Sequence, residues 1–310
     1  MKKFAFIFPG QGSQSVGMMQ GFAESPVVRH VFDEASQALG EDVWKLVAEG
    51  PAETLNSTVN TQPVMLTAGY ATYRAWLEAG GREPDLLAGH SLGEYTALVA
   101  AGVIAFRDAV PLVRFRAQAM QEAVPVGTGA MAAILGLDDA LVRKACADAA
   151  AGEAVEAVNF NAPSQVVIAG HKTAVERAAA AAKAAGAKRA VMLSVSAPFH
   201  SSLLQPAADR LAQYLERVPF QSPRIPVLNN VDVAVETDPQ AMKAALARQA
   251  CNPVRWTEVI RAMAARDIAA TVECGPGKVL AGLSKRIDTK LETYAITDPA
   301  SLAQTRGALA

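Results

Sequence analysis

The stretch D-L-L-A-G-H-S-L-G-E-Y-T-A-L-V-A-A, residues 85–101, decides how the rest of the chain is interpreted. A short apolar run opens it, Gly89 and Gly93 flank Ser91, and an apolar, helix-compatible segment begins at Glu94. This pattern predicts a strand, a sharp turn and a helix. In such a nucleophile elbow, glycines let the chain bend tightly enough to hold a serine hydroxyl out at the carboxyl edge of a sheet. Ser91 is therefore the candidate nucleophile.

The composition sets bounds on the fold and the partners. The chain has 310 residues, 51% of them hydrophobic, which is enough for one large domain or a large domain carrying an insert. Lysine and arginine total 29 against 30 aspartate and glutamate, giving a net charge of -1, so neither nucleic acid nor an anionic membrane is an expected partner. Cys146, Cys251 and Cys274 lack C-x-x-C spacing, which argues against a disulfide framework and a zinc site and favours a reducing, cytoplasmic compartment.

The N-terminus, M-K-K-F-A-F-I-F-P-G, imitates the basic start of a signal peptide. Pro9 and Gly10 stop its apolar run at residues 4–8, short of the roughly 7 to 15 apolar residues that a signal peptide needs. We therefore predict a buried strand there. No run approaches the ~18 apolar residues of a membrane span. The turn G-Q-G at residues 10–12 leaves backbone N–H groups available, but its spacing matches no phosphate-binding motif.

Helices are predicted at residues 27–39, 43–47 and 63–77, the last with Thr61 as its cap and Pro63 in its first turn. Near the C-terminus, T-V-E-C-G-P-G-K-V-L repeats the order strand, glycine turn and helix without a nucleophile. Glu273 in this run is interpreted as a helix cap, with orientation of a catalytic base as the alternative. The remaining predicted elements are a strand at 226–229 and helices at 240–249 and 252–263.

Arg116 lies in a predicted helix at residues 107–121. At 100° per residue, an apolar stripe runs along one side of this helix and polar residues gather on the other. Arg116 projects close to the centre of the apolar stripe, where an unpaired guanidinium would cost several kcal/mol if fully buried. Either an internal salt bridge or a snorkelling side chain satisfies it, or it awaits a carboxylate supplied by the substrate, which a planar guanidinium can hold bidentately.

Residues 128–197 differ from the chain around them in their pattern of predicted strands and helices. Strands and helices alternate there in the order β-α-β-β-α-β, which is that of a split βαβ, ferredoxin-like unit. An insert is therefore predicted, with Asn161 and Pro163 in a hairpin turn. Lys183, Lys188 and Arg189 make this unit locally basic. A solvated helix face explains these charges, and docking of an acidic partner is the alternative.

His200, in S-V-S-A-P-F-H-S-S, is the candidate base, at the start of a predicted helix that runs to about residue 217. His90 is adjacent to Ser91 in the sequence, so its side chain is expected to point away from the serine hydroxyl. A distant histidine on a loop can instead be brought to that hydroxyl by the fold.

Taken together, these motifs resemble those of the malonyl-CoA:acyl carrier protein transacylases of fatty acid synthesis. The resemblance covers nearly the whole chain, with the motifs in family order. They are G-Q-G at 10–12, G-H-S-L-G-E-Y at 89–95, Arg116, A-P-F-H at 197–200, N-P-V-R-W at 252–256 and E-C-G-P-G at 273–277. The resemblance implies an α/β fold: an α/β-hydrolase-like core with a parallel sheet, residues 1–127 and 198–310, carrying the ferredoxin-like insert at 128–197.

The resemblance also implies roles for individual residues. Ser91 is acylated and His200 acts as the base. Arg116 binds the malonyl carboxylate. The backbone N–H groups of Gln11 and Leu92 form the oxyanion hole. Two further roles concern the surroundings of the base: the backbone carbonyl of Gln249 orients His200, and Phe199 crowds an α-methyl group as in malonyl-selective members.

The implied reaction is a ping-pong transfer of malonyl from malonyl-CoA, through malonyl-serine, to the pantetheine thiol of acyl carrier protein. No cofactor or metal is implied, since coenzyme A leaves as a product and the phosphopantetheine belongs to the carrier. The carrier is expected to dock near Lys183, Lys188 and Arg189, and the chain to act as a monomer. A malonyltransferase of a polyketide pathway, a serine (thio)esterase and a non-catalytic carrier-docking module remain as alternatives.

Overall fold

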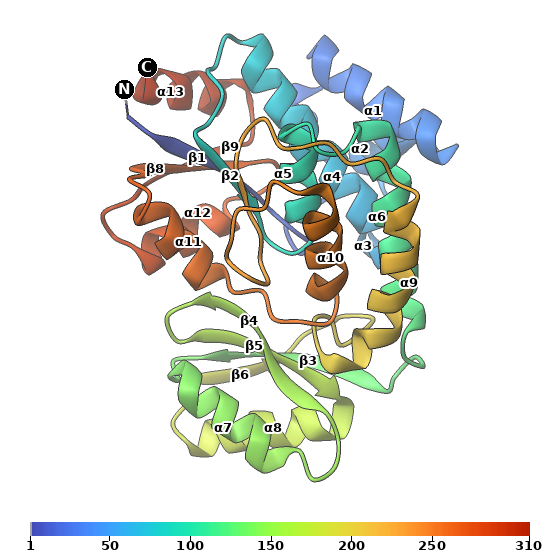
Figure 1. The fold of residues 1–310 in the computed structure, drawn as a ribbon, viewed down its shortest axis with the longest axis vertical. Coiled ribbons are helices and arrows are strands. Elements are labelled where there is room, and N and C mark those ends of the chain that lie inside the picture. The colour runs from blue at the N-terminus through green and yellow to red at the C-terminus, as the bar shows by residue number, and fades with distance from the viewer. Residues whose placement is uncertain (1) are drawn as a thin grey trace.

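The computed structural model describes residues 2–310. Within these residues, one sheet has five strands in the order β7-β2-β1-β8-β9, and all neighbouring pairs run parallel (Figure 1). The strands are β1 (Phe4–Phe8), β2 (Leu86–Gly89), β7 (Val227–Leu228), β8 (Ala270–Cys274) and β9 (Glu292–Ile296). The predicted α/β class with a parallel sheet is confirmed.

The central strand β1 is buried on both faces. Phe4, Phe6 and Phe8 belong to the apolar cluster on one face of the sheet, and Ala5 and Ile7 belong to the cluster on the other. Successive side chains of a strand point to opposite faces, so a strand covered by helices on both sides is apolar throughout. This explains why the N-terminal apolar run of the sequence is a strand.

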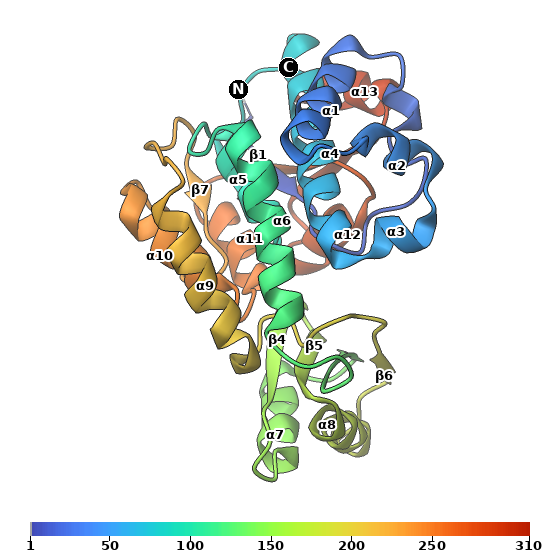
Figure 2. The same ribbon diagram turned by 90° about the vertical axis from the view of Figure 1, so that its right-hand side faces the viewer.

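Helices cover both faces of the parallel sheet. The larger cluster includes residues of α1 (Pro26–Leu39), α2 (Val43–Glu49), α3 (Ala52–Asn56), α4 (Thr58–Glu78), α5 (Gly93–Ala100), α6 (Phe106–Glu122), α9 (Gln205–Glu216), α10 (Pro239–Gln249) and α13 (Pro299–Leu309). The opposite face carries α11 (Trp256–Ala264) and α12 (Val279–Ile287). Figure 2 shows α6 running down the molecule toward the second sheet. None of the helices in residues 2–310 is long and apolar enough to cross a membrane.

The second sheet and its helices form what we call the four-stranded unit. Its elements follow the predicted β-α-β-β-α-β order, and within the described residues its antiparallel sheet has the order β4-β5-β3-β6. They are β3 (Gly129–Leu135), α7 (Asp139–Ala149), β4 (Val155–Ala162), β5 (Gln165–His171), α8 (Lys172–Ala184) and β6 (Arg189–Met192). The unit has an apolar cluster of its own and lies at the bottom of the molecule in Figure 1.

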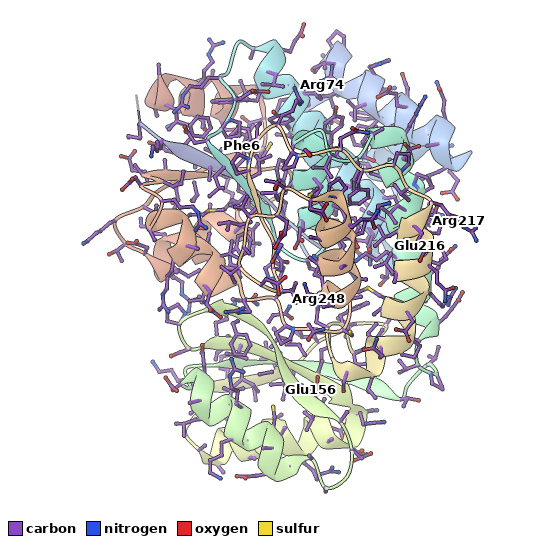
Figure 3. The ribbon with its side chains drawn as sticks, viewed as in Figure 1. Phe6, Arg74, Glu156, Glu216, Arg217 and Arg248 are labelled. Carbon is purple, nitrogen blue, oxygen red and sulfur yellow. The ribbon has the colours of Figure 1, made fainter. Side chains whose placement is uncertain are left out.

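Strand β4 joins the four-stranded unit to the rest of the molecule. The backbone N–H of Val254 donates to the carbonyl of Val158 at 2.8 Å, and the carbonyl of Val254 accepts from Phe160 at 3.0 Å. Glu156, which Figure 3 labels on this unit, accepts hydrogen bonds from the backbone N–H and the hydroxyl of Ser202. Ser202 opens the short 3-10 turn Ser202–Leu204, so β4 supports the segment just after His200.

Several local predictions were wrong. Helix α4 begins at Thr58, so Thr61 is inside it and donates to the carbonyl of Leu55 at 2.7 Å. Pro63 also lies within this helix. Asn161 belongs to β4, whereas Pro163 lies in the turn before β5, as predicted. Asn161 instead pairs with His90, which is distant in the sequence, so the local turn pattern did not show its role.

The C-terminal region holds two elements that the sequence did not predict, β9 and α13. The capping prediction for Glu273 is confirmed, because its carboxylate accepts a hydrogen bond from the backbone N–H of Ala281, in the first turn of α12, at 2.8 Å. An acid at this position also meets the positive end of the helix dipole.

Candidate active site

Ser91 lies in a tight turn between β2 and α5. Its φ of 53° is in the left-handed region, which side chains rarely adopt. The flanking glycines are required by space: a Cβ on Gly89 would lie 1.8 Å from the carbonyl carbon of Gly93, and one on Gly93 would lie 2.0 Å from the carbonyl oxygen of Phe8. The strained turn presents the Ser91 hydroxyl at the carboxyl end of β2.

His200 reaches this hydroxyl from the loop before α9. Its Nε2 lies 2.7 Å from Ser91 Oγ, and its Nδ1 lies 2.8 Å from the backbone carbonyl oxygen of Gln249. A carbonyl can only accept, so Nδ1 carries the proton and Nε2 is left to accept from the Ser91 hydroxyl. Burial and the nearby positive charge of Arg116 lower the pKa of His200 to about 3. The imidazole is therefore neutral at physiological pH and can act as a base.

Arg116 is brought to the same hydroxyl by α6. The residue is 2% exposed. Its Nη1 donates to Gln62 Oε1 at 2.8 Å, and its Nη2 donates to Gln249 Oε1 at 2.9 Å and to Ser91 Oγ at 3.2 Å. Its guanidinium carbon lies 5.3 Å from the centre of the Tyr95 ring.

The burial of Arg116 rules out a snorkelling side chain. Within residues 2–310 no carboxylate forms an ion pair with it, and its hydrogen-bond partners Gln62, Gln249 and Ser91 are neutral. Burial lowers the pKa of the guanidinium, although an arginine remains charged at neutral pH. A buried cation without a paired anion thus lies beside the candidate nucleophile.

Two turns beside Ser91 carry backbone N–H groups that have no acceptor within residues 2–310. The G-Q-G turn packs against the elbow, since a Cβ on Gly10 would lie 2.6 Å from the carbonyl oxygen of His90 and 3.8 Å from the nitrogen of Leu92. No acceptor in residues 2–310 is hydrogen-bonded to the backbone N–H of Gln11 or of Leu92. The N–H of Ser91, by contrast, donates to Asn230 Oδ1 at 2.7 Å. The two unpartnered donors are those that the family resemblance implies.

His90 points away from the nucleophile, as its adjacency to Ser91 predicted. Its Nε2 lies 2.8 Å from Asn161 Oδ1, on β4 of the four-stranded unit, and its ring packs at 5.5 Å from that of Trp256. Burial lowers the pKa of His90. This histidine therefore joins the elbow to the four-stranded unit.

The sequence reasoning missed several polar residues around the site. Asn230 holds both sides of the elbow, accepting from the N–H of Ser91 and donating to the carbonyl of Gly89 at 2.7 Å. Gln62 comes from α4 to accept from Arg116. Neither lies in a motif with a recognisable chemical pattern. Glu94 did carry a signal, because it is an acid within a segment that is otherwise apolar, and it is 2% exposed.

The other predicted residues lie outside this hydrogen-bonded cluster. Phe199, next to His200, is half-buried and packs against the apolar clusters of the core and of the four-stranded unit. Lys183, Lys188 and Arg189 are exposed on the four-stranded unit, where Lys183 Nζ donates to the carbonyl of Lys188 at 3.2 Å.

Comparison with known proteins decides the family. The model of the acyl transferase domain family matches residues 5–296. Over 304 residues the chain is 58% identical to the malonyl CoA-acyl carrier protein transacylase of Escherichia coli K12, covering 98% of both chains. The chain belongs to the malonyl-CoA:acyl carrier protein transacylase family. The Bacillus subtilis transacylase is 45% identical over 304 residues, with 97% of this chain and 96% of that protein covered.

Solved structures of transacylases agree with this membership. The acyl-carrier-protein S-malonyltransferase of Burkholderia pseudomallei superposes with a TM-score of 0.98 at 64% identity, over 98% of this chain and 99% of that chain. A malonyl-transacylase in complex with its type II polyketide acyl carrier protein gives a TM-score of 0.98 at 53% identity, over 99% of this chain and all of that chain. The fold of this chain is thus also that of a transacylase that acts with a polyketide carrier.

Proposed function

We propose that Ser91 carries the malonyl group between coenzyme A and acyl carrier protein. As a malonyl-CoA:acyl carrier protein transacylase, the chain is an S-malonyltransferase that feeds fatty acid synthesis. The observation that carries the residue assignment is the 3.2 Å contact between Nη2 of the buried Arg116 and Ser91 Oγ. A thioester that ends in a carboxylate would place that carboxylate against the guanidinium and its carbonyl against the hydroxyl.

The first step forms the acyl-enzyme. Nε2 of His200 takes the proton as Ser91 Oγ attacks the thioester carbonyl, and the bond from Nδ1 to the Gln249 carbonyl steadies the imidazolium that forms. The oxyanion accepts from the backbone N–H groups of Gln11 and Leu92. One such donor contributes about 2.7 to 4 kcal/mol in other enzymes. Collapse of this intermediate breaks the carbon–sulfur bond, and the protonated His200 supplies the proton that leaves with coenzyme A.

The second step repeats the chemistry in reverse. The pantetheine thiol of the carrier gives its proton to His200 and attacks the malonyl ester carbonyl. When the ester bond breaks, His200 returns the proton to Ser91 Oγ. Each half-reaction exchanges one acyl bond for another, so the transfer needs no cofactor and ends with the free serine.

Arg116 selects the acyl group. An acetyl group has no carboxylate, so it leaves the buried guanidinium without an anion and forgoes a charge-assisted, bidentate contact. Phe199 borders the acyl group and, by its size, disfavours an α-methyl substituent. Selection therefore depends on charge at one end of the acyl group and on space beside its α-carbon.

We further infer how the chain is divided into a core and an insert. The core of residues 1–127 and 198–310 is α/β-hydrolase-like, because an elbow serine follows a strand of its parallel sheet. Residues 128–197 form a ferredoxin-like insert, and the βαββαβ order and the β4-β5-β3-β6 strand arrangement support this.

The acidic carrier docks near Lys183, Lys188 and Arg189. The chain works as a monomer in the cytoplasm, where its cysteines remain thiols.

A brief exposure to malonyl-CoA tests the proposal. Mass spectrometry of the intact protein should then show one added malonyl group, and a peptide digest should locate it on Ser91. Addition of a carrier protein should remove the label and yield malonyl-carrier. A protein that releases free malonate at the same rate with and without carrier is an esterase and contradicts the transfer mechanism.

A further inference from the structure

Glu94 is a buried acid that the transfer mechanism does not use. It lies in the first turn of α5, directly after the elbow, and is 2% exposed. Its Oε2 accepts from the backbone N–H of Asn230 and from Nε2 of Gln249, both at 2.9 Å. Burial raises the pKa of Glu94 to about 7, so holding it inside the protein is costly. The fold therefore retains this buried acid at a cost in free energy.

The side-chain amide of Gln249 connects Glu94 to the site. Its Nε2 donates to Glu94 Oε2 and, at 3.0 Å, to the backbone carbonyl oxygen of Ser91. A carbonyl oxygen only accepts, and Glu94 Oε2 is already an acceptor for the N–H of Asn230, so the nitrogen of the amide must face these two groups. The amide oxygen is then forced toward Arg116, where it accepts from Nη2 at 2.9 Å.

The opposite orientation of this amide would disable the cation. A flipped Gln249 would point its NH2 group at Nη2 of Arg116, so that two donors would face each other in a buried place. The acceptor at position 94, together with the Ser91 carbonyl, opposes this flip. It therefore controls the position of the same Nη2 that contacts Ser91 Oγ.

We propose that Glu94 is a positioning residue for the acyl carboxylate site: through the side-chain amide of Gln249, it fixes the Arg116 guanidinium beside Ser91 and thereby contributes to the choice of malonyl over acetyl. This inference rests on the proposed role of Arg116. Glu94 touches neither the acyl group nor the reacting atoms, so its effect appears in selectivity and not in the chemistry of the serine.

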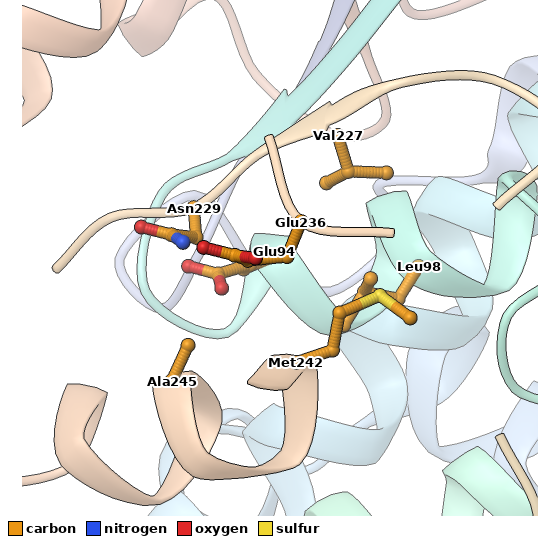
Figure 4. Close-up of a pocket in the computed structure, with 7 residues that line it drawn as sticks. All are labelled: Glu94, Leu98, Val227, Asn229, Glu236, Met242 and Ala245. Carbon is orange, nitrogen blue, oxygen red and sulfur yellow. The ribbon is translucent and has the colours of Figure 1, made fainter. Parts of the chain in front are cut away.

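Glu94 has two hydrogen-bonded links to the site: the Gln249 amide, which leads to Arg116, and the backbone N–H of Asn230, whose side chain holds the elbow. On the other side, Glu94 lines a small cavity with Asn229, Glu236 and Met242, which Figure 4 shows next to α10. At about 10 Å3 this cavity has room for about one water molecule and none for a substrate. Nδ2 of Asn229, 6% exposed, has no hydrogen-bond partner within residues 2–310, and a water there would join it to the carboxylate.

The test compares single-turnover acylation of Ser91 by malonyl-CoA and by acetyl-CoA. Glu94→Ala removes the acceptor, and its ratio of malonyl to acetyl rates should fall about tenfold, the effect of one misdirected hydrogen bond to a charged group. Glu94→Gln retains an oxygen that can accept from the same two N–H groups, and should keep the ratio within about threefold of the original protein. A merely structural role would lower both rates alike.

Glu273→Ala is the matched control. Glu273 is also a buried acid whose pKa burial raises to about 7, and it lies near the carboxyl end of β8 in the parallel sheet. Its bond goes to the N–H of Ala281, not to Gln249. We expect this variant to lose stability without a change in the ratio.

Gln249→Leu guards against an unfolded Glu94→Ala protein, because it removes the amide and keeps the backbone carbonyl that holds His200. It should lower the ratio as Glu94→Ala does. The inference is overturned if the two rates fall equally, if the ratio stays unchanged in both variants, or if Glu94→Gln is as unselective as Glu94→Ala. If Arg116→Ala also leaves the ratio unchanged, the proposed function of Arg116 fails first.

Discussion

Two turns at the carboxyl edge of the parallel sheet share one design and differ in chemistry. In the elbow, β2 leads through a turn to α5, and in the second turn β8 leads through G-P-G to α12. Each turn has a buried glutamate beside it, Glu94 or Glu273, with a pKa raised to about 7. The strand–turn–helix backbone therefore does not by itself make an active site.

The two turns differ in which residue adopts the strained, positive-φ conformation. In the second turn the positive φ angles belong to Gly275 and Gly277, at 133° and 88°, where no side chain can be presented. In the elbow, a serine takes a φ of 53°, and other segments bring His200 and Arg116 to its hydroxyl. Backbone strain on a residue with a hydroxyl, together with converging partners, distinguishes the reactive turn.

The largest expected effect comes from removing the one hydroxyl that makes the elbow reactive. Ser91→Ala should abolish acylation by malonyl-CoA, because no oxygen remains for the acyl group. Intact-mass measurement after exposure to the thioester checks this. Ser284→Ala, which removes a buried hydroxyl from α12 after the second turn, is the matched change and should acylate normally. Residual labelling of the Ser91→Ala protein at another residue would break the comparison.

The next effect concerns the base that reaches only the elbow. His200→Ala should slow acylation by about 10²- to 10⁴-fold, the usual contribution of general acid–base catalysis. Thioester binding should persist, because the imidazole acts on the hydroxyl and not on the acyl carboxylate. Stopped-flow acylation and equilibrium binding of malonyl-CoA to the same variant separate the two. An acylation rate equal to that of the original protein would leave His200 without a role.

A smaller and selective effect is expected from removing the guanidinium of Arg116. Arg116→Ala should lower the malonyl acylation rate about 100-fold or more, since the buried, charge-assisted contact is lost, and the acetyl rate by less than about tenfold. Arg116→Lys should recover part of the malonyl rate, because an ammonium keeps the charge but lacks the bidentate fork. Equal losses with malonyl-CoA and acetyl-CoA would make the arginine a structural residue.

The smallest effect on activity belongs to the second turn, where the change is in stability. The Glu273 carboxyl ionises near 4.5 in the unfolded chain but keeps its proton until about pH 7 in the folded protein. The unfolded state loses this proton first, so the free energy of unfolding falls as pH rises from about 4.5 to about 7, by up to about 3 kcal/mol.

Glu273→Gln should remove that part of the pH dependence. Urea unfolding at pH 5 and pH 8 should show a smaller loss of stability in the variant than in the original protein, while Ser91 acylation changes little. Glu94, with a raised pKa of its own, contributes the same slope to both proteins. A variant whose stability falls as steeply as before would mean that Glu273 is not the group that titrates.

Local patterns in the sequence predicted much of the fold. The alternation of apolar runs and turns gave the central strand at residues 4–8, the elbow, and the βαββαβ order of the four-stranded unit, because each depends on neighbours a few residues apart. The same reasoning missed β9 and α13. It also misassigned Thr61, which bonds to Leu55 across the junction of α3 and α4, and Asn161, which bonds to His90 in the elbow.

The sequence alone determined which residues have the right chemistry: a serine between glycines, a histidine far along the chain, and an arginine on an apolar helix face. Only the tertiary structure decided that His200 and Arg116 meet at one hydroxyl, that Gln249 bonds to both of them, that no carboxylate of residues 2–310 pairs with the arginine, and that Glu94 accepts from the Gln249 amide. The physical reason is that periodicity and turn chemistry are local, whereas hydrogen-bond direction and burial depend on side chains that the sequence separates and packing brings together.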